Sequence, residues 1–428
     1  MRIRRWLAGF SVAAALVALA GCGSSGNSDS GAGGVVELKF LSLAYQPPTV
    51  AAVKKVVDDF NSSHSNIHVT IEQGSFDTAN DQLTTQFQGG TAPDIIHLQA
   101  SLITGFEQQG YLADLTPYVD PAIKSGITND VWQTVSLNGK VYAEPTLLQS
   151  YVVFANTDQF QAAGVTVPTG DTMSWDQLQS MATSLTRDGH AGLGWGLKSP
   201  AATVMNLALG FGGNYFSGDS AKPKLTVGAN ELQVPQRMKA MITNKSLSAT
   251  SVTQSGADSL PAFYAGGYAM VVGGDFIAQS IKAAAPANFH WTVLPALAGT
   301  SSAHQAADPQ SLSVARQSKH VKEAAEFVNF YLQPKNLAAV AQGDWLIPTS
   351  KAARDEVLAQ TNGADGWKQI LPTATQLVNA PFQAAQGYPK WKTQALQPAL
   401  QKYLAGSLDD AGLTSALTKG WDAVQSGG

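Results

Sequence analysis

The body of the chain opens with two different spacings of apolar residues. Val36, Leu38 and Phe40 alternate with charged residues, which is the two-residue period of a half-buried β-strand. Between residues 50 and 60 the apolar positions recur every three or four residues, with charges on the other faces, and this spacing predicts an amphipathic helix. The folded part of the chain is therefore expected to begin with a strand and then a helix, separated by the Pro-Pro pair at 47–48.

The same two spacings repeat further along the chain. Residues 67–71 alternate as a second strand, apolar residues at 83–87 mark a second helix, and residues 94–98 form a short apolar third strand. Strands that alternate with helices predict an α/β fold with a parallel sheet and right-handed crossovers. Ligands of such sheets bind beyond the carboxyl ends of the strands. The loops expected near a ligand are therefore those at residues 42–48, 73–77 and 99–103.

The first residues of the chain have the order of a secretory signal. Arg2, Arg4 and Arg5 give a basic start, and an uncharged apolar run follows over residues 7–20. A membrane-spanning helix needs about 20 apolar residues, so this shorter run is interpreted as part of a cleaved signal. The arginine pair leaves both the general and the twin-arginine export routes open.

Cys22 is the only cysteine of the chain, and it follows Leu-Ala-Gly at the end of the apolar run. These four residues resemble the lipobox of bacterial lipoproteins, in which the signal is cut before the cysteine and the thiol is lipidated. Residues 1–21 would then be the signal peptide, and residues 22–34, rich in Gly, Ser, Ala and Asn, a flexible linker. The resemblance implies a lipid anchor on the extracytoplasmic face of the cell membrane. An ordinary signal followed by an unpaired cysteine is the alternative.

Composition favours a large globular body without a nucleic-acid partner. The 428-residue chain is 44% hydrophobic and 14% charged, with a formal net charge of −4. Its length beyond the linker is enough for two domains. No basic stretch of the kind that binds nucleic acid is present. Without a cysteine in the body, neither a disulfide framework nor thiol chemistry is expected.

Motifs for catalysis and for bound cofactors are missing. The chain has no G-x-S-x-G, no H-E-x-x-H and no G-x-x-x-x-G-K-S/T segment. His64 and His68 have the spacing of a metal pair, but their segment has the pattern of a turn into a strand, so no metal site is predicted. We expect neither an enzyme nor a cofactor. The carboxylates left open as a glycoside-hydrolase pair are Asp94, Asp275 and Asp308.

Six segments match, in order, a pattern that spans nearly the whole body of the chain. They are Ala-Pro-Asp-Ile-Ile at 92–96, Gly-Tyr-Leu-Ala-Asp-Leu at 110–115, Asn-Gly-Lys-Val-Tyr-Ala-Glu-Pro at 138–145, Phe-Ala-Asn-Thr-Asp at 154–158 with Ser-Trp-Asp-Gln-Leu at 174–178, Phe-Tyr-Ala-Gly-Gly-Tyr-Ala-Met at 263–270, and Leu-Ile-Pro-Thr at 346–349. Together they resemble the extracellular solute-binding proteins of ABC importers, in the sugar-binding family that includes maltose-binding protein.

The resemblance implies the two-lobed, type II periplasmic-binding-protein-like fold, in which each lobe is a mostly parallel sheet flanked by helices. The chain would cross between the lobes near residues 145–151, 294–311 and 348. Lobe one is expected to comprise residues 35–145 plus 306–347, and lobe two residues 146–305 plus 348–428. Lobes joined by few crossings move relative to each other, and a ligand that contacts both favours the closed form.

A sugar site needs polar side chains for the hydroxyl groups and flat aromatic rings for the apolar faces. In lobe one and the first crossing, the resemblance places such contacts at Tyr45, Gln46, Gln99, Ser101 and Gln149. Maltose-binding relatives carry an aromatic residue and an acid after the third strand and a glutamate at the crossing. Their absence argues against a long α-glucan, although the amide of Gln149 can both donate to and accept from hydroxyls.

In lobe two, the resemblance places Phe276 where the family has a sugar-stacking tryptophan, with Asp275 beside it as an acceptor for hydroxyls. Asp275 could instead cap a helix. The further aromatic candidates, each of which could instead pack in the core, are Trp345, Tyr388 and Trp391. Trp175, by contrast, opens a helix and is expected to be a core residue.

These features together predict the membrane-anchored binding component of an ABC importer. It would be a monomer that captures a mono- or oligosaccharide between its lobes and delivers it to permease subunits. A receptor of the same fold for a polyol, a glycerol-phosphate-type solute or a polyamine is one alternative, and the scarcity of acidic clusters disfavours the polyamine. A secreted carbohydrate hydrolase and a surface adhesion lipoprotein are the others.

Overall fold

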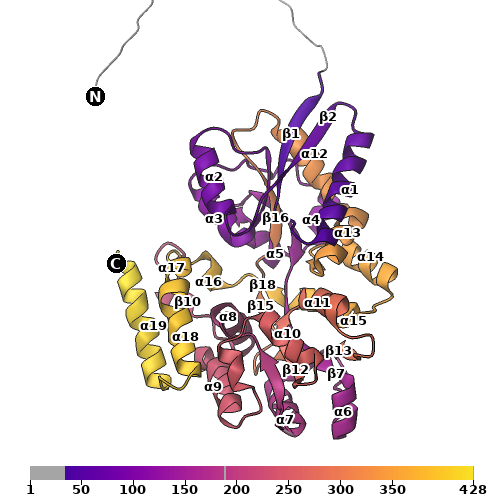
Figure 1. The fold of residues 1–428 in the computed structure, drawn as a ribbon. Helices are drawn as coiled ribbons and strands as arrows, with labels where there is room; N and C mark the ends of the chain where they lie inside the picture. The colour runs from indigo at the N-terminus through magenta and orange to yellow at the C-terminus, as the bar shows by residue number, and fades with distance from the viewer. Residues whose placement is uncertain (1–33, 188, 428) are drawn as a thin grey trace, which may run out of the picture. The chain divides into compact units, whose positions relative to one another are not determined.

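Two β-sheets organise the computed structural model, which describes residues 34–187 and 189–427. Both sheets belong to one compact unit, Val35–Gly428 (Figure 1). The predicted signal peptide and lipidated Cys22 fall on residues 1–33 and lie outside the described residues. No helix in the described part of the chain has both the length and the apolar character needed to cross a bilayer.

The first sheet begins with the elements that the apolar spacing predicts. In chain order they are β1 (Val36–Ser42), α1 (Pro47–Ser63), β2 (Ile67–Gln73), α2 (Ala79–Gln88) and β3 (Ile95–Gln99). β1 pairs in parallel with both β2 and β3, so the predicted strand-helix-strand order and the parallel pairing are confirmed. Pro47 and Pro48 lie in the first turn of α1, where an amide hydrogen has no partner within the helix, and they begin the helix.

Later segments return to complete this six-stranded sheet, whose order is β17-β6-β16-β3-β1-β2. β16 (Gln310–Val314) lies antiparallel between β3 and β6 (Ala143–Leu148), and β17 (Ile347–Pro348) lies antiparallel to β6. Helix α13 (Pro334–Asp344) packs against α1, and α12 (Val321–Tyr331) lies beside both helices. The sheet is mixed, not mostly parallel as expected, because each of the later strands β16, β6 and β17 pairs antiparallel with its neighbours.

The second sheet has four strands in the order β13-β7-β12-β9. They are β7 (Tyr151–Asn156), β9 (Ala191–Trp195), β12 (Tyr268–Gly274) and β13 (Trp291–Val293), and only β9 and β12 pair in parallel. Its flanking helices are α6 (Thr157–Ala163), α7 (Trp175–Leu185), α8 (Ala201–Ala208), α9 (Ala229–Thr243), α10 (Gly256–Tyr264) and α11 (Ile277–Ala284). Trp175 is buried at the start of α7, where Ser174 and Gln177 form a capping box, so the core prediction for this residue is confirmed.

Shorter elements connect and cover the two sheets. They include α3 (Ala100–Gln108), α4 (Pro121–Gly126), α5 (Asn129–Thr134), β4 (Ser136–Leu137), β5 (Lys140–Val141), β8 (Thr172–Ser174), β10 (Phe216–Ser217), β11 (Lys224–Leu225), β14 (Ala296–Ala298), β15 (Gln305–Ala306) and β18 (Leu377–Val378). The C-terminal helices are α14 (Lys351–Thr361), α15 (Trp367–Ile370), α16 (Pro381–Ala384), α17 (Tyr388–Trp391), α18 (Gln397–Leu404) and α19 (Asp410–Gln425), with a π-helical turn at Lys392–Leu396 before α18.

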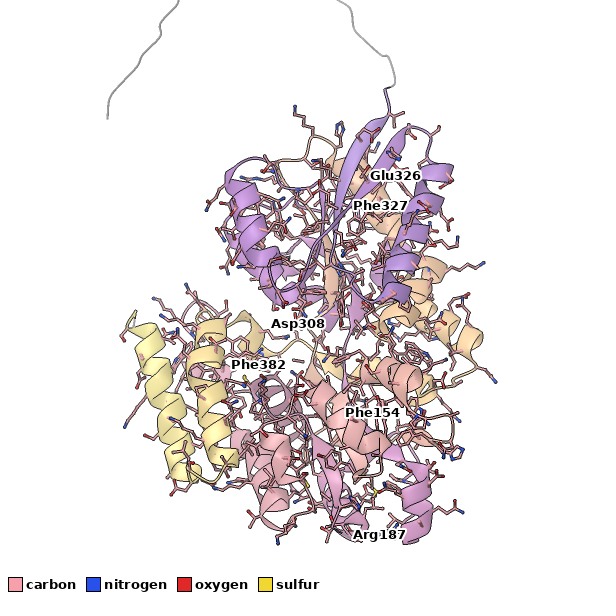
Figure 2. All side chains as sticks on the ribbon, viewed as in Figure 1. Phe154, Arg187, Asp308, Glu326, Phe327 and Phe382 are labelled. Carbon is pink, nitrogen blue, oxygen red and sulfur yellow. The ribbon has the colours of Figure 1, made fainter. Side chains whose placement is uncertain are left out.

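Packing separates the two faces of the second sheet. Val152 and Phe154 on β7 join the apolar cluster that also fills the first sheet, whereas Val153 and Ala155 join a second cluster with the C-terminal helices. Figure 2 shows Phe154 among the side chains around the second sheet and Phe327 among those around the first. The two-residue period of β7 therefore divides its side chains between two cores.

Only Gln149 and Ser150 separate β6 of the first sheet from β7 of the second. The chain returns by way of β15, which pairs with β18, and enters the first sheet at β16. These sheets define two lobes, and the predicted residue-by-residue division between them stays a prediction.

Candidate functional site

Three of the predicted lobe-one contacts lie at the ends of β1 and β3. Tyr45 is 68% exposed, Gln46 is half-buried, and Gln99 at the end of β3 is exposed. All three lie at the carboxyl ends of parallel strands, where ligands of α/β sheets bind. An exposed aromatic ring can stack on an apolar face of a ligand, and side-chain amides can bond to its polar groups.

Gln149 and Phe276 come together at the crossing between the sheets. Gln149 is exposed and Phe276 half-buried. A methyl group placed on Gly274 would contact the Phe276 ring and lie 3.0 Å from Nε2 of Gln149, so these side chains both adjoin the backbone of Gly274. A residue without a side chain is required here because the ring and the amide occupy that space. The structure therefore brings one predicted residue of the crossing next to one predicted residue of lobe two.

Asp275 is not placed as predicted. Its side chain is 0% exposed, with Oδ1 accepting from the Phe276 amide at 3.1 Å and Oδ2 without a partner among the described residues. Burial raises the pKa of the carboxyl well above its usual range. A carboxyl without exposed surface cannot accept from ligand hydroxyls, so the prediction of a direct contact is wrong for this conformation.

Trp345 ends α13 in a left-handed conformation, with φ 56°. Its ring stacks on Trp367 with 5.3 Å between centroids, the ammonium group of Lys282 lies 5.4 Å from its centroid, and only 8% of the residue is exposed. The indole N–H has no partner among the described residues. The ring is therefore already used in packing, and little of the side chain remains for a ligand.

The two aromatic candidates at the C-terminal helices are mainly packing residues. Trp391 is 0% exposed, and its Nε1 donates to the carbonyl of Leu417 at 2.9 Å, so its prediction as a ligand contact is wrong. Tyr388 is buried against Phe382, with ring centroids 5.3 Å apart, and burial raises the pKa of its hydroxyl. These side chains belong to the second core because α19 covers them, which the local sequence does not reveal.

Ser101 lines a small polar pocket between the lobes. Its amide and hydroxyl donate to Asp308 at 2.9 and 3.1 Å, at the first turn of α3. The pocket has a volume of about 90 Å³, and its lining includes Ser101, Thr104, Gln133, Asp308, Asn379 and Gln383. Ser101 is placed at this pocket and its hydroxyl is occupied by Asp308.

Asp308 lies between β15 and β16, where the chain returns to the first sheet (Figure 2). Partial burial raises the pKa of its carboxyl, while the hydrogen bonds from Ser101 and the charge of Lys392 oppose the shift. Asp94 lies at the opposite end of β3, where it accepts from the Lys39 amide. The five residues of β3 span roughly 16 Å, which is more than the 5 to 10 Å or so of a glycosidase pair. With Asp275 buried, these three carboxyls do not form the hydrolase arrangement.

A buried polar cluster under the Tyr45 loop was not predicted. It consists of Thr49, His97, Gln310 and Asp344, which come from α1, β3, β16 and α13. Burial lowers the pKa of His97 to about 4, so the imidazole is neutral at pH 7. The polar residue within the apolar β3 was the only local signal, and its partners lie far away in sequence.

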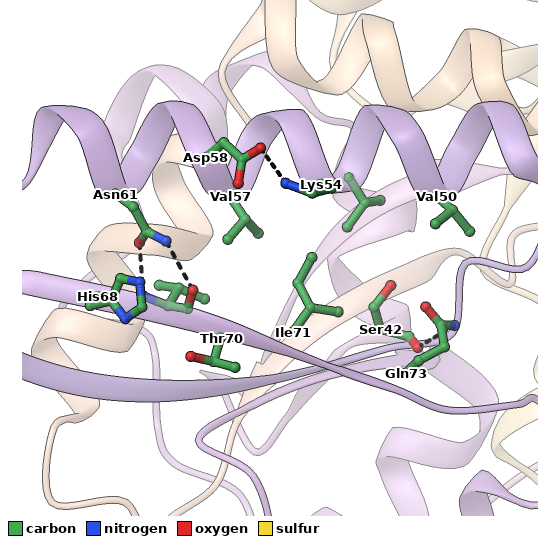
Figure 3. Close-up of a pocket in the computed structure, with 12 residues that line it drawn as sticks. Ser42, Val50, Lys54, Val57, Asp58, Asn61, His68, Thr70, Ile71 and Gln73 are labelled. Carbon is green, nitrogen blue, oxygen red and sulfur yellow. Dashed lines mark hydrogen bonds and ion pairs between the residues drawn. The ribbon is translucent and has the colours of Figure 1, made fainter.

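A larger groove of about 390 Å³ lies between α1 and the edge strand β2 (Figure 3). Its walls include Val50, Val57 and Ile71, and one end is closed by Ser42 and Gln73. None of the predicted ligand contacts lines it. No group of three or more potential metal-ligating His, Cys, Asp or Glu residues is found among the residues that the structure describes.

A family model for the bacterial extracellular solute-binding protein matches residues 45–338. The chain belongs to this family. This solute-binding protein is 37% identical, over 411 residues, to an "uncharacterized lipoprotein in oleD 5' region" of Streptomyces antibioticus, covering 95% of this chain and 89% of the relative.

Solved structures with the same architecture cover nearly all of this solute-binding protein. A cyclic α-maltosyl-1,6-maltose-binding protein of Arthrobacter globiformis matches with a TM-score of 0.78 and 17% identity over 92% of this chain and 100% of that chain. The GacH receptor of Streptomyces glaucescens matches with a TM-score of 0.74 and 20% identity over 91% of this chain and 98% of that chain. At these identities the likeness establishes the two-lobed fold.

Proposed function

We propose that this solute-binding protein captures a mono- or oligosaccharide between its lobes and delivers it to the permease of an ABC importer. The observation that carries the proposal is the set of exposed or half-exposed rings and amides at the strand ends of the first sheet and at the crossing: Tyr45, Gln46, Gln99, Gln149 and Phe276. Uncharged amides and flat rings suit the hydroxyls and apolar faces of a neutral sugar.

The relatives support a saccharide ligand. The Arthrobacter globiformis protein is named for a cyclic maltosyl-maltose, and the GacH receptor has been solved in complex with acarbose. A ligand that contacts both lobes stabilises the closed form by its differential affinity, and the closed form is the state for a permease to recognise. No step in this role requires a chemical change of the ligand, so we propose a receptor without enzymatic activity.

Lipidation of Cys22 would keep the receptor at the extracytoplasmic face of the cell membrane. The Streptomyces antibioticus relative is named a lipoprotein, which supports this part of the proposal. Replacing Cys22→Ser in the full chain should move the protein from the membrane fraction to the soluble fraction. Continued membrane retention of that variant would contradict lipidation at this residue.

The ligand is tested by titrating the delipidated body with mono- and oligosaccharides and polyols, following tryptophan fluorescence and heat. We expect at least one saccharide to bind with a Kd near or below 1 μM, which is about −8 kcal/mol. Chromatography of the same mixtures should recover the sugar intact. Hydrolysis products would contradict the receptor, and binding of polyols alone would replace the sugar with the polyol alternative.

A further inference from the structure

The loop that carries Tyr45 and Gln46 is held at several points by polar contacts from below. At one end the amide of Leu43 donates to Nδ1 of His97 at 3.2 Å. At the other end Oγ1 of Thr49 donates to Oδ1 of Asp344 at 2.6 Å. The loop is therefore fixed on both sides of its exposed residues.

Gln73 adds a third attachment from the neighbouring strand. Its Nε2 donates to the carbonyl of Ala44 at 2.6 Å and to that of Ser42 at 3.1 Å. Figure 3 shows Gln73 beside Ser42 at the end of the groove. The carbonyl adjacent to Tyr45 in the chain is thus fixed by a side chain of β2.

The two ends of the loop are connected to each other through the buried side chains of His97 and Asp344 and the half-buried side chain of Gln310. A backbone amide can only donate, so Nδ1 of His97 must accept and the ring proton must lie on Nε2. Nε2 then donates to Oε1 of Gln310 at 2.9 Å. The amide nitrogen of Gln310 faces Oδ2 of Asp344 at 3.5 Å, the longest link. Each donor in the series meets an acceptor.

Burial favours one geometry of these side chains over alternatives. His97 and Asp344 are 4% and 5% exposed, and Thr49 is 1% exposed. A buried polar group that loses its partner is costly, so the series holds one geometry in preference to alternatives. The protonation state agrees, because burial lowers the pKa of His97 to about 4 and keeps Nδ1 free to accept.

We propose that His97, Gln310 and Asp344 are positioning residues that hold Tyr45 ready for the ligand. None of the three needs to touch the ligand, since their effect passes through the backbone of Leu43 and through Thr49. A ring that is already fixed loses less conformational entropy on binding than a ring on a mobile loop. The effect on affinity rests on the proposed function, whereas the effect on the loop does not.

The affinity test is a double-mutant cycle between Thr49 and Tyr45. Thr49→Val removes the hydroxyl donor with little change of volume, and Thr49→Ser keeps the donor. Thr49→Val should weaken binding of the tightest saccharide about tenfold, which is an ordinary coupling for connected residues. The affinity of Thr49→Ser should stay within about twofold of that of the wild type. In the Tyr45→Ala background, Thr49→Val should cause no further loss.

Additive losses in that cycle, or equal losses for Thr49→Val and Thr49→Ser, would overturn the proposal. Either result would mean that Thr49 supports the lobe generally and does not act through Tyr45. The matched control is Ser313→Ala, which removes a buried hydroxyl of β16 whose partner is the Ile96 carbonyl. This control should leave saccharide affinity unchanged.

Hydrogen exchange tests the same proposal without a ligand. Thr49→Val should speed amide exchange of the segment Leu43–Gln46 relative to the wild type and to Ser313→Ala, with the rest of the first sheet unchanged. Unchanged exchange in that segment, or faster exchange throughout the sheet, would overturn the proposal that these residues hold the loop. If no saccharide binds the wild type, the proposed function fails, but this measurement still shows whether the hydrogen-bond series holds the loop.

Discussion

The loop after β1 and the C-terminal aromatic segment carry similar residues but differ in how far they expose them. Tyr45 is 68% exposed on a loop at the carboxyl ends of parallel strands, whereas Trp391 is 0% exposed in a core. Residue type therefore does not separate a ligand platform from a packing residue. The position in the topology does, because Tyr45 follows the carboxyl end of a parallel strand, where ligands of α/β sheets bind, whereas the C-terminal helices cover one another.

Replacing Trp391→Ala should have the largest effect on stability. The change leaves a cavity among Phe216, Tyr215 and Trp421 and deprives the Leu417 carbonyl of its donor, so the free energy of unfolding should fall by about 3 to 5 kcal/mol. Urea unfolding followed by circular dichroism measures this. Saccharide affinity of the folded variant should change less than threefold or so, and a selective loss of affinity would reverse our assignment.

Glu144 and His97 are both buried polar residues of the first sheet, but Glu144 lacks the hydrogen-bond partners that His97 has. Both of its carboxyl oxygens lack partners among the described residues, and burial, with a smaller effect of the Asp120 charge, raises its pKa to about 8. The folded form holds a proton that the unfolded form releases above its usual pKa of 4.5. Stability from this group is therefore full below pH 4.5 and is lost as the pH rises through 8.

Unfolding free energies at pH 5 to 9 test this prediction. The wild type should lose up to about 4 kcal/mol over the range, from a shift of this size, and Glu144→Gln should remove most of the slope. An equal slope in both proteins would show that Glu144 ionises normally and has partners that it lacks in this structure.

His97 should give the opposite dependence on pH. Its pKa is lowered from 6.5 to about 4, so the unfolded chain takes up a proton before the folded protein does. The stability that comes from neutral His97 is full above pH 6.5 and is lost as the pH falls toward 4. His97→Gln keeps an acceptor and a donor but does not titrate. Between pH 6.5 and 4 its unfolding free energy should therefore fall by up to about 3 kcal/mol less than that of the wild type. Matching profiles would contradict a buried neutral imidazole.

The smallest expected effect on stability, with a clear effect on binding, is that of Tyr45→Ala. Removing an exposed side chain should change the free energy of unfolding by less than about 0.5 kcal/mol. Losing a stacking ring should weaken the binding free energy of the tightest saccharide by about 1 to 2 kcal/mol. Calorimetric titration and urea unfolding of the same preparation measure both. If Tyr45→Ala lost stability but not affinity, Tyr45 would behave as a packing residue like Trp391, which would contradict our account.

Local sequence periodicity was sufficient to predict the first three strands of the first sheet and the loops that follow them. The alternation at Val36, Leu38 and Phe40, the parallel order, and the buried helix-opening Trp175 are all local patterns, and they are confirmed. The exposure of Tyr45 also follows from its place at a strand end. Such properties depend on neighbours within a few residues.

Contacts between distant segments were not predictable in the same way. Trp391 is buried by Trp421 on a later helix, and His97 meets Gln310 across 213 residues of sequence. Asp275 follows an apolar strand as a ligand acid would, but its backbone amide donates to Ser150 and its carboxyl turns inward. The mixed sheets arise for the same reason, since β16 returns from far along the chain.

A crystal structure of the complex with the tightest saccharide tests the central claim most directly. We expect the sugar between the lobes, with the ring of Tyr45 against one of its apolar faces and the amide of Gln149 within hydrogen-bond distance of a hydroxyl. The Leu43 amide should still donate to His97. A sugar in the groove between α1 and β2, or a sugar between the lobes that leaves Tyr45 and Gln149 in solvent, would contradict the account.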